Sequence, residues 1–214
     1  MNCNVELHIN PVNGTWTLGA TEQGQVVLVF DDTCSTESRE LVFHLVGEGA
    51  VLDVIFIAQR TVPELLKVSL RIVHEGARTK AAVWAASVLQ NSAAQDVRGM
   101  IQICKGAKGA DSALSHRTLT LSATAKSVTI PSLEIEEDDV KASHAGVTGP
   151  VDPEQLFYLQ TRGVSTEEAQ QVIAQGFLEQ VIEKIKDEGI RENVNKLLSL
   201  DVIPAKAGIQ VNPH

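Results

Sequence analysis

The sequence predicts a mainly β fold, with a right-handed β-helix or solenoid core and a small C-terminal helical subdomain. Three observations support this prediction: short segments in which apolar residues alternate, glycine turns that recur at a regular interval, and helix-capping patterns confined to the C-terminal part of the chain. Of the 214 residues, 43% are apolar and 21% are charged. A chain of this size can bury one sizeable core and carry a small appended element.

The core is expected to span residues 26–149, preceded by cap strands in residues 1–25. Segments such as LVFHLV, VLDVIFI, VSLRIV and VRGMIQI alternate apolar and polar residues, which is typical of half-buried strands. Aromatic residues make up only 4% of the chain. The small aliphatic side chains that dominate these segments suit the narrow interior of a solenoid, whose coils bury one another.

Turns of similar sequence separate these strands: Glu48-Gly49-Ala50, Glu75-Gly76-Ala77 and Lys105-Gly106-Ala107. Their spacing of roughly thirty residues falls in the range of solenoid repeats. We interpret Thr124-Ala125-Lys126 as a fourth, degenerate copy. A β-sandwich with an irregular strand order is the alternative that the residues alone leave open.

The helical subdomain is expected in residues 150–200, followed by an extended tail in residues 201–214. Asp152 and Ser165 are good N-caps, with Gln155 and Glu168 at the capping-box positions, and Gly163 ends the first helix. The second helix carries one apolar stripe: Ala169, Val172, Ile173, Phe177, Val181, Ile182 and Ile185. We expect Gly189 to interrupt this helix and residues 191–200 to add a short third one.

Composition argues against several classes of function. The net charge is −9, which disfavours binding to nucleic acid or to anionic lipid. The sequence has no signal peptide and no apolar run of the roughly 18 residues that span a membrane, so we expect a cytoplasmic protein. The three cysteines, Cys3, Cys34 and Cys104, are far apart, which indicates free thiols rather than disulfides. No phosphate-binding loop of the GxxxxGK[ST] kind is present.

His144 is the most interesting single residue, because it stands between an acidic segment and the turn-like sequence SHAGVTG. Neutral imidazole is a good iron ligand and carries protons near physiological pH. A lone histidine at a strand end is more often structural, however. Cys104 is expected to be a small buried apolar residue, and the acidic run from Glu134 to Asp139 a solvated face rather than a metal site.

The stretch from Pro131 to Phe177 resembles the C-terminal signature of the SufB/SufD family, the scaffold proteins of Suf iron–sulfur cluster assembly. The matching pieces, in order, are DDVKASHA, FYLQTRG and QGF. The resemblance extends from about Leu41 to Ile185 and implies a β-helix core. The segment before the core is too short for the helical N-terminal domain that usually precedes it in this family, so we expect that domain to be lacking.

The resemblance also implies a site. His144 matches the histidine of the SHGAT motif in SufD-like members, where it is implicated in building the nascent cluster between SufB and SufD. Counting back without gaps, His116 stands where SufB-like members carry the cluster-forming cysteine, and Ala145 stands where they carry a glutamate. The chain is therefore expected to be SufD-like, with the two imidazoles His116 and His144 but no sulfur-accepting thiolate.

Partners follow from the same resemblance. A SufC-type ATPase is expected to dock on the C-terminal helices, at Phe157, Tyr158, Arg162, Gly163 and Phe177, and a SufB-like protein or a second copy to pair through the late coils. Any iron or iron–sulfur cluster is expected to be transient and held at a subunit interface, with none bound by this chain alone and no catalysis. Two alternatives remain. One is a carbohydrate-active enzyme on a β-solenoid, which is disfavoured because such enzymes usually hold sugar rings with aromatic residues and this chain has few. The other is a degenerate paralogue that only binds SufC.

Overall fold

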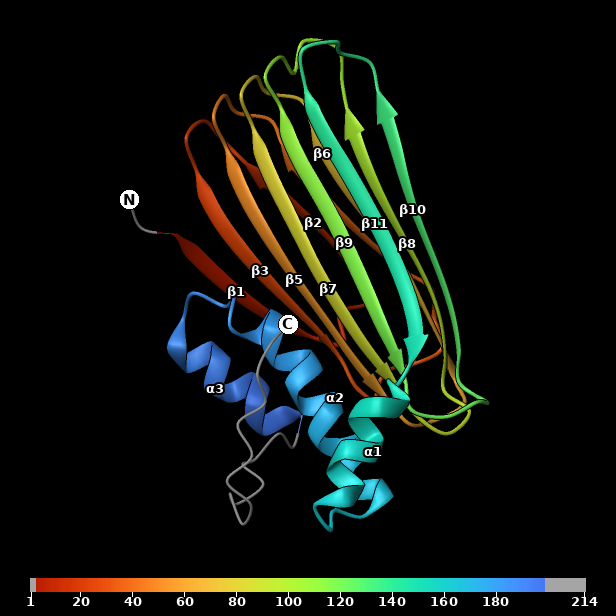
Figure 1. Ribbon diagram of the computed structural model, residues 1–214. Coiled ribbons are helices and arrows are strands. Elements are labelled where there is room, and N and C mark those ends of the chain that lie inside the picture. The colour runs from red at the N-terminus through yellow and green to blue at the C-terminus, as the bar shows by residue number, and fades with distance from the viewer. Residues whose placement is uncertain (1–2, 199–214) are drawn as a thin grey trace.

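The computed structural model describes residues 3–198 and consists of a parallel β-solenoid of about five turns with three short helices at its C-terminal end (Figure 1). Its strands are β1 (Asn4–Ile9), β2 (Asn13–Leu18), β3 (Gln23–Phe30), β4 (Arg39–Leu45), β5 (Val51–Arg60), β6 (Leu65–His74), β7 (Lys80–Leu89), β8 (Ala94–Ile103), β9 (Asp111–Thr120), β10 (Lys126–Ile135) and β11 (Lys141–Pro150).

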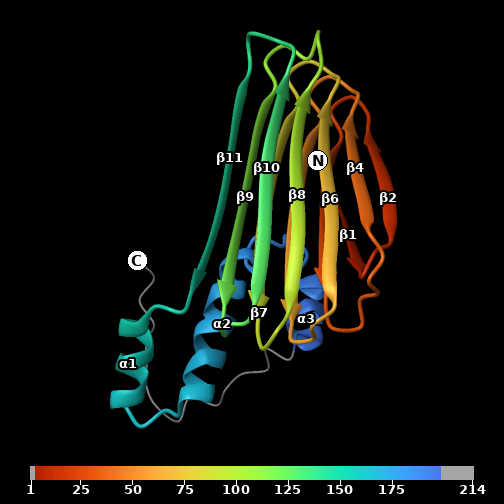
Figure 2. The same ribbon diagram turned by 90° about the vertical axis from the view of Figure 1, so that its right-hand side faces the viewer.

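The chain alternates strictly between two parallel sheets. The odd sheet has the order β1-β3-β5-β7-β9-β11, and the even sheet has the order β10-β8-β6-β4-β2. Figure 1 looks onto the odd sheet, and Figure 2 shows the even strands from the side. This topology confirms the predicted solenoid, and it excludes the sandwich alternative because every second strand continues the same sheet.

The core between the sheets is built by alternation. Every second residue of each strand points inward, as in β4, where Leu41, Phe43 and Leu45 are buried and the residues between them are more exposed. Stacked coils place these side chains against equivalent ones from their neighbours, such as Phe30 against Phe56, whose ring centroids lie 4.9 Å apart. The solenoid interior is thus one continuous apolar column.

The turns that lead from even to odd strands form a ladder, but its register differs from the predicted one. Thr21, Gly49, Arg78 and Gly109 stack on one another, with positive φ of 60°, 71°, 54° and 73°. All four amides donate to carbonyls of the next coil at 2.7–2.9 Å. Gly76 is equivalent to Gly47 rather than Gly49, since both amides bond to a leucine carbonyl one coil back.

Gly76 also has its own reason to be glycine: a Cβ there would lie 2.6 Å from the Gly47 carbonyl oxygen. The prediction for Thr124-Ala125-Lys126 was wrong. This segment connects odd β9 to even β10 and therefore lies at the opposite end of the coils. The turn that continues the ladder contains Asp139, whose carbonyl accepts from the Gly109 amide at 2.7 Å.

Three helices follow the strands: α1 (Pro153–Thr161), α2 (Thr166–Ile182) and α3 (Glu188–Leu197). The Asp152 side chain caps α1, and the predicted capping box between Ser165 and Glu168 is present. Gly189 does not interrupt a helix as predicted. It lies in the first turn of α3, because the Asp187 carboxylate caps that helix by accepting from the Ile190 amide at 2.8 Å.

Helices α2 and α3 cover the lower half of the odd sheet and leave the even sheet bare (Figures 1 and 2). Between the odd sheet and the helices lies a second core, in which Leu178 and Ile182 meet Val27, Val29 and Ile57. The buried Gln25 fixes the α2–α3 connection, because its amide donates to the Lys184 carbonyl at 2.9 Å and accepts from the Lys186 amide at 2.8 Å.

No helix within residues 3–198 is long and apolar enough to cross a membrane. The proposed boundaries at residues 26 and 150 stay predictions, and the predicted tail, residues 201–214, lies outside the described residues.

Candidate functional site at the C-terminal end of the solenoid

Within residues 3–198, the last coil of the solenoid has a neighbouring coil on one side only. β10 and β11 are the edge strands of their sheets, and they meet each other across the end, where Gly146 lies against Thr129 and Pro131. The coil exposes a set of large apolar side chains, which we call the apolar rim: Val128, Ile130, Leu133, Ile135 and Val147. Unpaired edges and exposed apolar surface together are typical of a protein interface.

His144 lies on β11 of the same coil. It is paired in register with Leu114 on β9, so its side chain is on the face of β11 that continues the solenoid interior. It is nevertheless exposed, because the described part of the chain places no further coil on β11. The imidazole is therefore accessible to a molecule that packs on the last coil.

His116 lies one strand further in and is in a different environment. It is only 2% exposed, its Nε2 lies 2.9 Å from the Ser87 hydroxyl, and its ring packs 5.5 Å from that of Phe56. Burial lowers its pKa from 6.5 to about 4, so the imidazole is neutral at physiological pH. A cavity of about 20 Å³, which Leu114 also lines, adjoins it.

The two predicted histidines are thus neighbours in the fold. His116 pairs with Gly146 and His144 with Leu114, which puts their Cα atoms roughly 8 Å apart on adjacent strands. Only His144 can meet a partner directly. His116 is enclosed, so any contribution from it acts through the packing of the last coil.

Sequence reasoning missed the polar character of the interior at this end. The Gln95 amide donates to the hydroxyls of Thr118 at 3.0 Å and Ser127 at 2.9 Å, and its Oε1 is buried without a partner. Polar residues at interior positions of late strands were the available signal, since Leu66 stands one coil before Gln95 and Phe56 two coils before His116.

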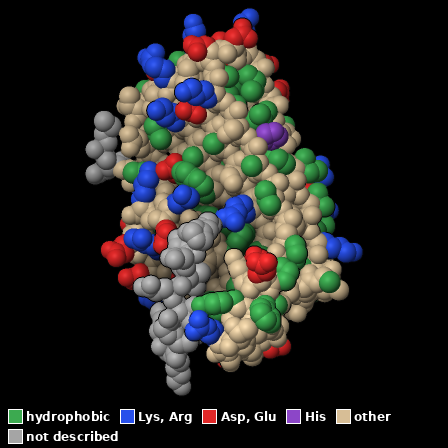
Figure 3. Space-filling model, viewed as in Figure 1, with side chains coloured by type: hydrophobic (Ala, Val, Ile, Leu, Met, Phe, Trp, Pro, Cys, Tyr) green, Lys and Arg blue, Asp and Glu red, His purple; other side chains and the backbone are tan. Residues whose placement is uncertain are grey.

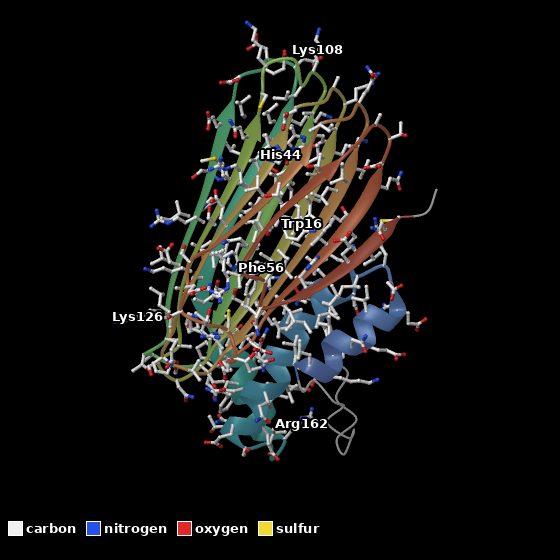
Figure 4. All side chains as sticks on the ribbon, turned by 180° about the vertical axis from the view of Figure 1, so that it is seen from behind. Trp16, His44, Phe56, Lys108, Lys126 and Arg162 are labelled. Carbon is white, nitrogen blue, oxygen red and sulfur yellow. The ribbon has the colours of Figure 1, made fainter. Side chains whose placement is uncertain are left out.

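The predicted SufC-docking residues fall into two groups. Phe157, which is 67% exposed, and Tyr158 lie on α1, with the Arg162 guanidinium 5.3 Å from the Tyr158 ring centroid, and Gly163 ends the helix at a φ of +84°. In Figure 4, Lys126 lies at one end of the strands, and Arg162 lies further out, beside the helices. Phe177 instead packs toward the odd sheet and is partly covered by Arg117, 5.2 Å away.

No group of three His, Cys, Asp or Glu side chains in residues 3–198 is placed to share a metal ion. The Cys104 thiol is half-buried, and burial together with the nearby carboxylates of Glu75, Glu136 and Glu134 raises its pKa, so it is a poor thiolate.

In the acidic run, Glu136 and Glu137 accept hydrogen bonds from the amides of Lys105 and Gly106. These two residues cap the preceding turn.

The chain is similar to known proteins over most of its length. Residues 33–177 match the family model described as "SUF system FeS cluster assembly, SufBD core domain". The chain is 31% identical over 187 residues to the iron-sulfur cluster assembly protein SufD of Bacillus subtilis (strain 168), a match that covers 87% of this chain and 40% of that protein. It is also 31% identical over 158 residues to iron-sulfur cluster assembly SufBD family proteins of Staphylococcus epidermidis (strain ATCC 12228) and Staphylococcus aureus (strain USA300), covering 74% of this chain and 34% of each relative. The chain thus spans at most 40% of the length of these relatives.

Proposed function

This chain belongs to the SufB/SufD family of the SUF system, and from that premise we propose that it is a SufD-like scaffold subunit of iron–sulfur cluster assembly in the cytoplasm. The observation that carries the proposal is the last coil, where the open edges of β10 and β11, the apolar rim and the accessible His144 lie together. No catalytic residue is proposed.

In this proposal the last coil pairs with a SufB-like protein or with a second copy of this chain. Pairing hides the two open sheet edges and removes the apolar rim from water. It also brings His144 to the interface, where its imidazole binds iron of the nascent cluster or carries a proton. Thiolates are the main ligands of such clusters, but the last coil, residues 126–150, contains no cysteine, and His116 on β9 stands where the resemblance places the cluster-forming cysteine of SufB-like members. The thiolates are therefore supplied by the partner.

We further propose that a SufC-type ATPase docks on α1. The chain has no phosphate-binding loop of its own, so any use of ATP depends on such a partner. Phe157 and Tyr158 give α1 an exposed aromatic surface, and aromatic residues are enriched in protein interfaces. The helix-bearing side of the molecule carries charges of both signs among hydrophobic side chains (Figure 3), which is compatible with a polar rim around that surface.

His144→Ala tests the site. We expect this variant to lower the yield of iron–sulfur cluster in the complex reconstituted with SufB-like and SufC-like partners. The yield is measured by iron content and visible absorbance. Binding of the SufC-like protein is expected to be unchanged. The matched control is His44→Ala, because His44 lies on the outer face of the even sheet, paired with Glu75 at 2.6 Å and away from the last coil. A normal cluster yield from the His144→Ala complex would remove His144 from the site.

The alternative of a paralogue that only binds SufC gives a different result. Such a protein would co-purify with the SufC-like ATPase but would pair with neither a SufB-like protein nor itself, and no cluster would depend on it. The carbohydrate-active alternative is not favoured by the match to an assembly family.

A further inference from the structure

The N-terminal end of the solenoid contains a hollow of about 340 Å³, far from the last coil. Its walls come from β1, β2, β3 and the turn between β2 and β3, and its apolar floor includes Leu18, Val26 and Leu52. This volume lies in the range of small-molecule sites. Nothing in the proposed scaffold function uses it.

Two carboxylates line the hollow, and both are held in place. Glu6 accepts from the Trp16 indole at 3.1 Å and from the Asn4 amide at 3.1 Å, and His8 Nε2 lies 3.2 Å from it. Glu22 accepts from the Gly19 amide at 2.7 Å through one oxygen. No lysine or arginine is among the described residues that line the hollow, so its fixed charge is negative.

Trp16 adds an aromatic wall. Its ring is stacked on Phe43, with centroids 4.6 Å apart and planes 13° from parallel, and the same side chain lines the hollow. Trp16 lies within the strand layer and not among the helices (Figure 4). An indole ring is the strongest natural partner for a cation that approaches an aromatic face.

We propose that this hollow binds a small aliphatic cation: a guanidinium or primary amine on an alkyl chain. The alkyl chain packs on Leu18 and Leu52, and the charged head lies between Glu6 and Glu22 beside Trp16. Anionic ligands are disfavoured by the two carboxylates, and a purely apolar ligand would leave these carboxylates desolvated. The cation comes either as a free amine or as the arginine or lysine side chain of another protein.

The two tryptophans of the chain make the test direct, because each gives its own indole NH signal in a ¹H–¹⁵N spectrum. The probes are agmatine, arginine capped at both ends, and the equally capped citrulline, which has the same shape without the charge. We expect the cationic probes to shift the Trp16 signal. The Trp84 signal, from the odd sheet under Lys184, is expected to stay in place.

Variants complete the test. Glu22→Gln is expected to weaken binding up to about fivefold, the upper value for one exposed ion pair. Glu64→Gln, an equal charge change at the opposite end of the coils, leaves binding unchanged. Response to agmatine alone identifies a free amine as the ligand, and tighter binding of capped arginine identifies a protein side chain. The proposal is overturned by no shift of Trp16, by an equal shift with citrulline, or by equal weakening in both variants.

Discussion

The histidines of this chain differ in burial, according to their place in the coils. His74 is fully buried, with Nδ1 bonded to the Thr79 hydroxyl at 2.8 Å, and burial lowers its pKa to about 4. His116 is buried in the same way, with a pKa of about 4. His144 is exposed and is the one available for chemistry at the last coil.

The buried pair predicts an acid-sensitive fold. In the unfolded chain each imidazole titrates near 6.5, but in the folded chain near 4, so between these values the unfolded state binds more protons. The free energy of unfolding is therefore not reduced by these histidines above about pH 6.5. It falls as the pH drops toward 4, by up to about 3 kcal/mol for each histidine. We expect urea unfolding at several pH values in this window to show the loss.

His116→Gln is expected to reduce that pH dependence by about half, whatever its effect on stability at neutral pH. Leu178→Ala, which removes a fully buried side chain without a titratable group, serves as the control and should leave the slope unchanged. An unchanged slope in His116→Gln would mean that His116 is not held neutral by burial.

This difference between histidines could not be predicted from the sequence. His116 and His144 occupy interior-facing positions of neighbouring strands, so alternation alone treats them alike. What separates them is that β9 is covered by β11, whereas β11 is the edge strand of its sheet among the residues that the structure describes. The order of coils at the end of a solenoid is a property of the whole fold, and a local pattern of period two does not contain it.

At the scale of elements, the helices are bound to the solenoid by a wider surface than the sequence indicated. The capping pattern placed the start of α2 correctly at Ser165, because caps are local. The predicted stripe omitted Ala174 and Leu178, which the structure buries. A helix that lies along a sheet buries a broad arc, and the width of that arc depends on the sheet beneath it.

Leu178→Ala tests this packing. Because Leu178 is fully buried between α2 and the odd sheet, the truncation should lower the free energy of unfolding by about 2–5 kcal/mol, measured by chemical denaturation. Phe157→Ala removes a larger side chain from the exposed face of α1 and should change it by less than about 0.5 kcal/mol. Equal losses in the two variants would contradict the assigned helix–sheet core.

At the scale of the whole molecule, the two ends of the solenoid are different. The first coil has six-residue strands, and its interior ends in the bonded cluster of Glu6, His8 and Trp16. The last coil has ten-residue strands and the apolar rim. The repeated turns predicted the solenoid, but they did not predict the difference between its two ends. They also did not predict the correct register of the turns, which depends on the stacked positive-φ positions.

The most direct test of the account is whether the last coil forms the subunit interface. Ile130→Asp and Leu133→Asp place a charge on the apolar rim, and Val46→Asp places one at an exposed valine of a turn in an earlier coil. The variants would be co-expressed with SufB-like and SufC-like proteins, and the mass of the complex measured by light scattering after size exclusion. We expect the wild-type chain and Val46→Asp to pair with the SufB-like protein or with themselves, and the two rim variants to remain unpaired but folded. Pairing of the rim variants at wild-type strength would contradict the account.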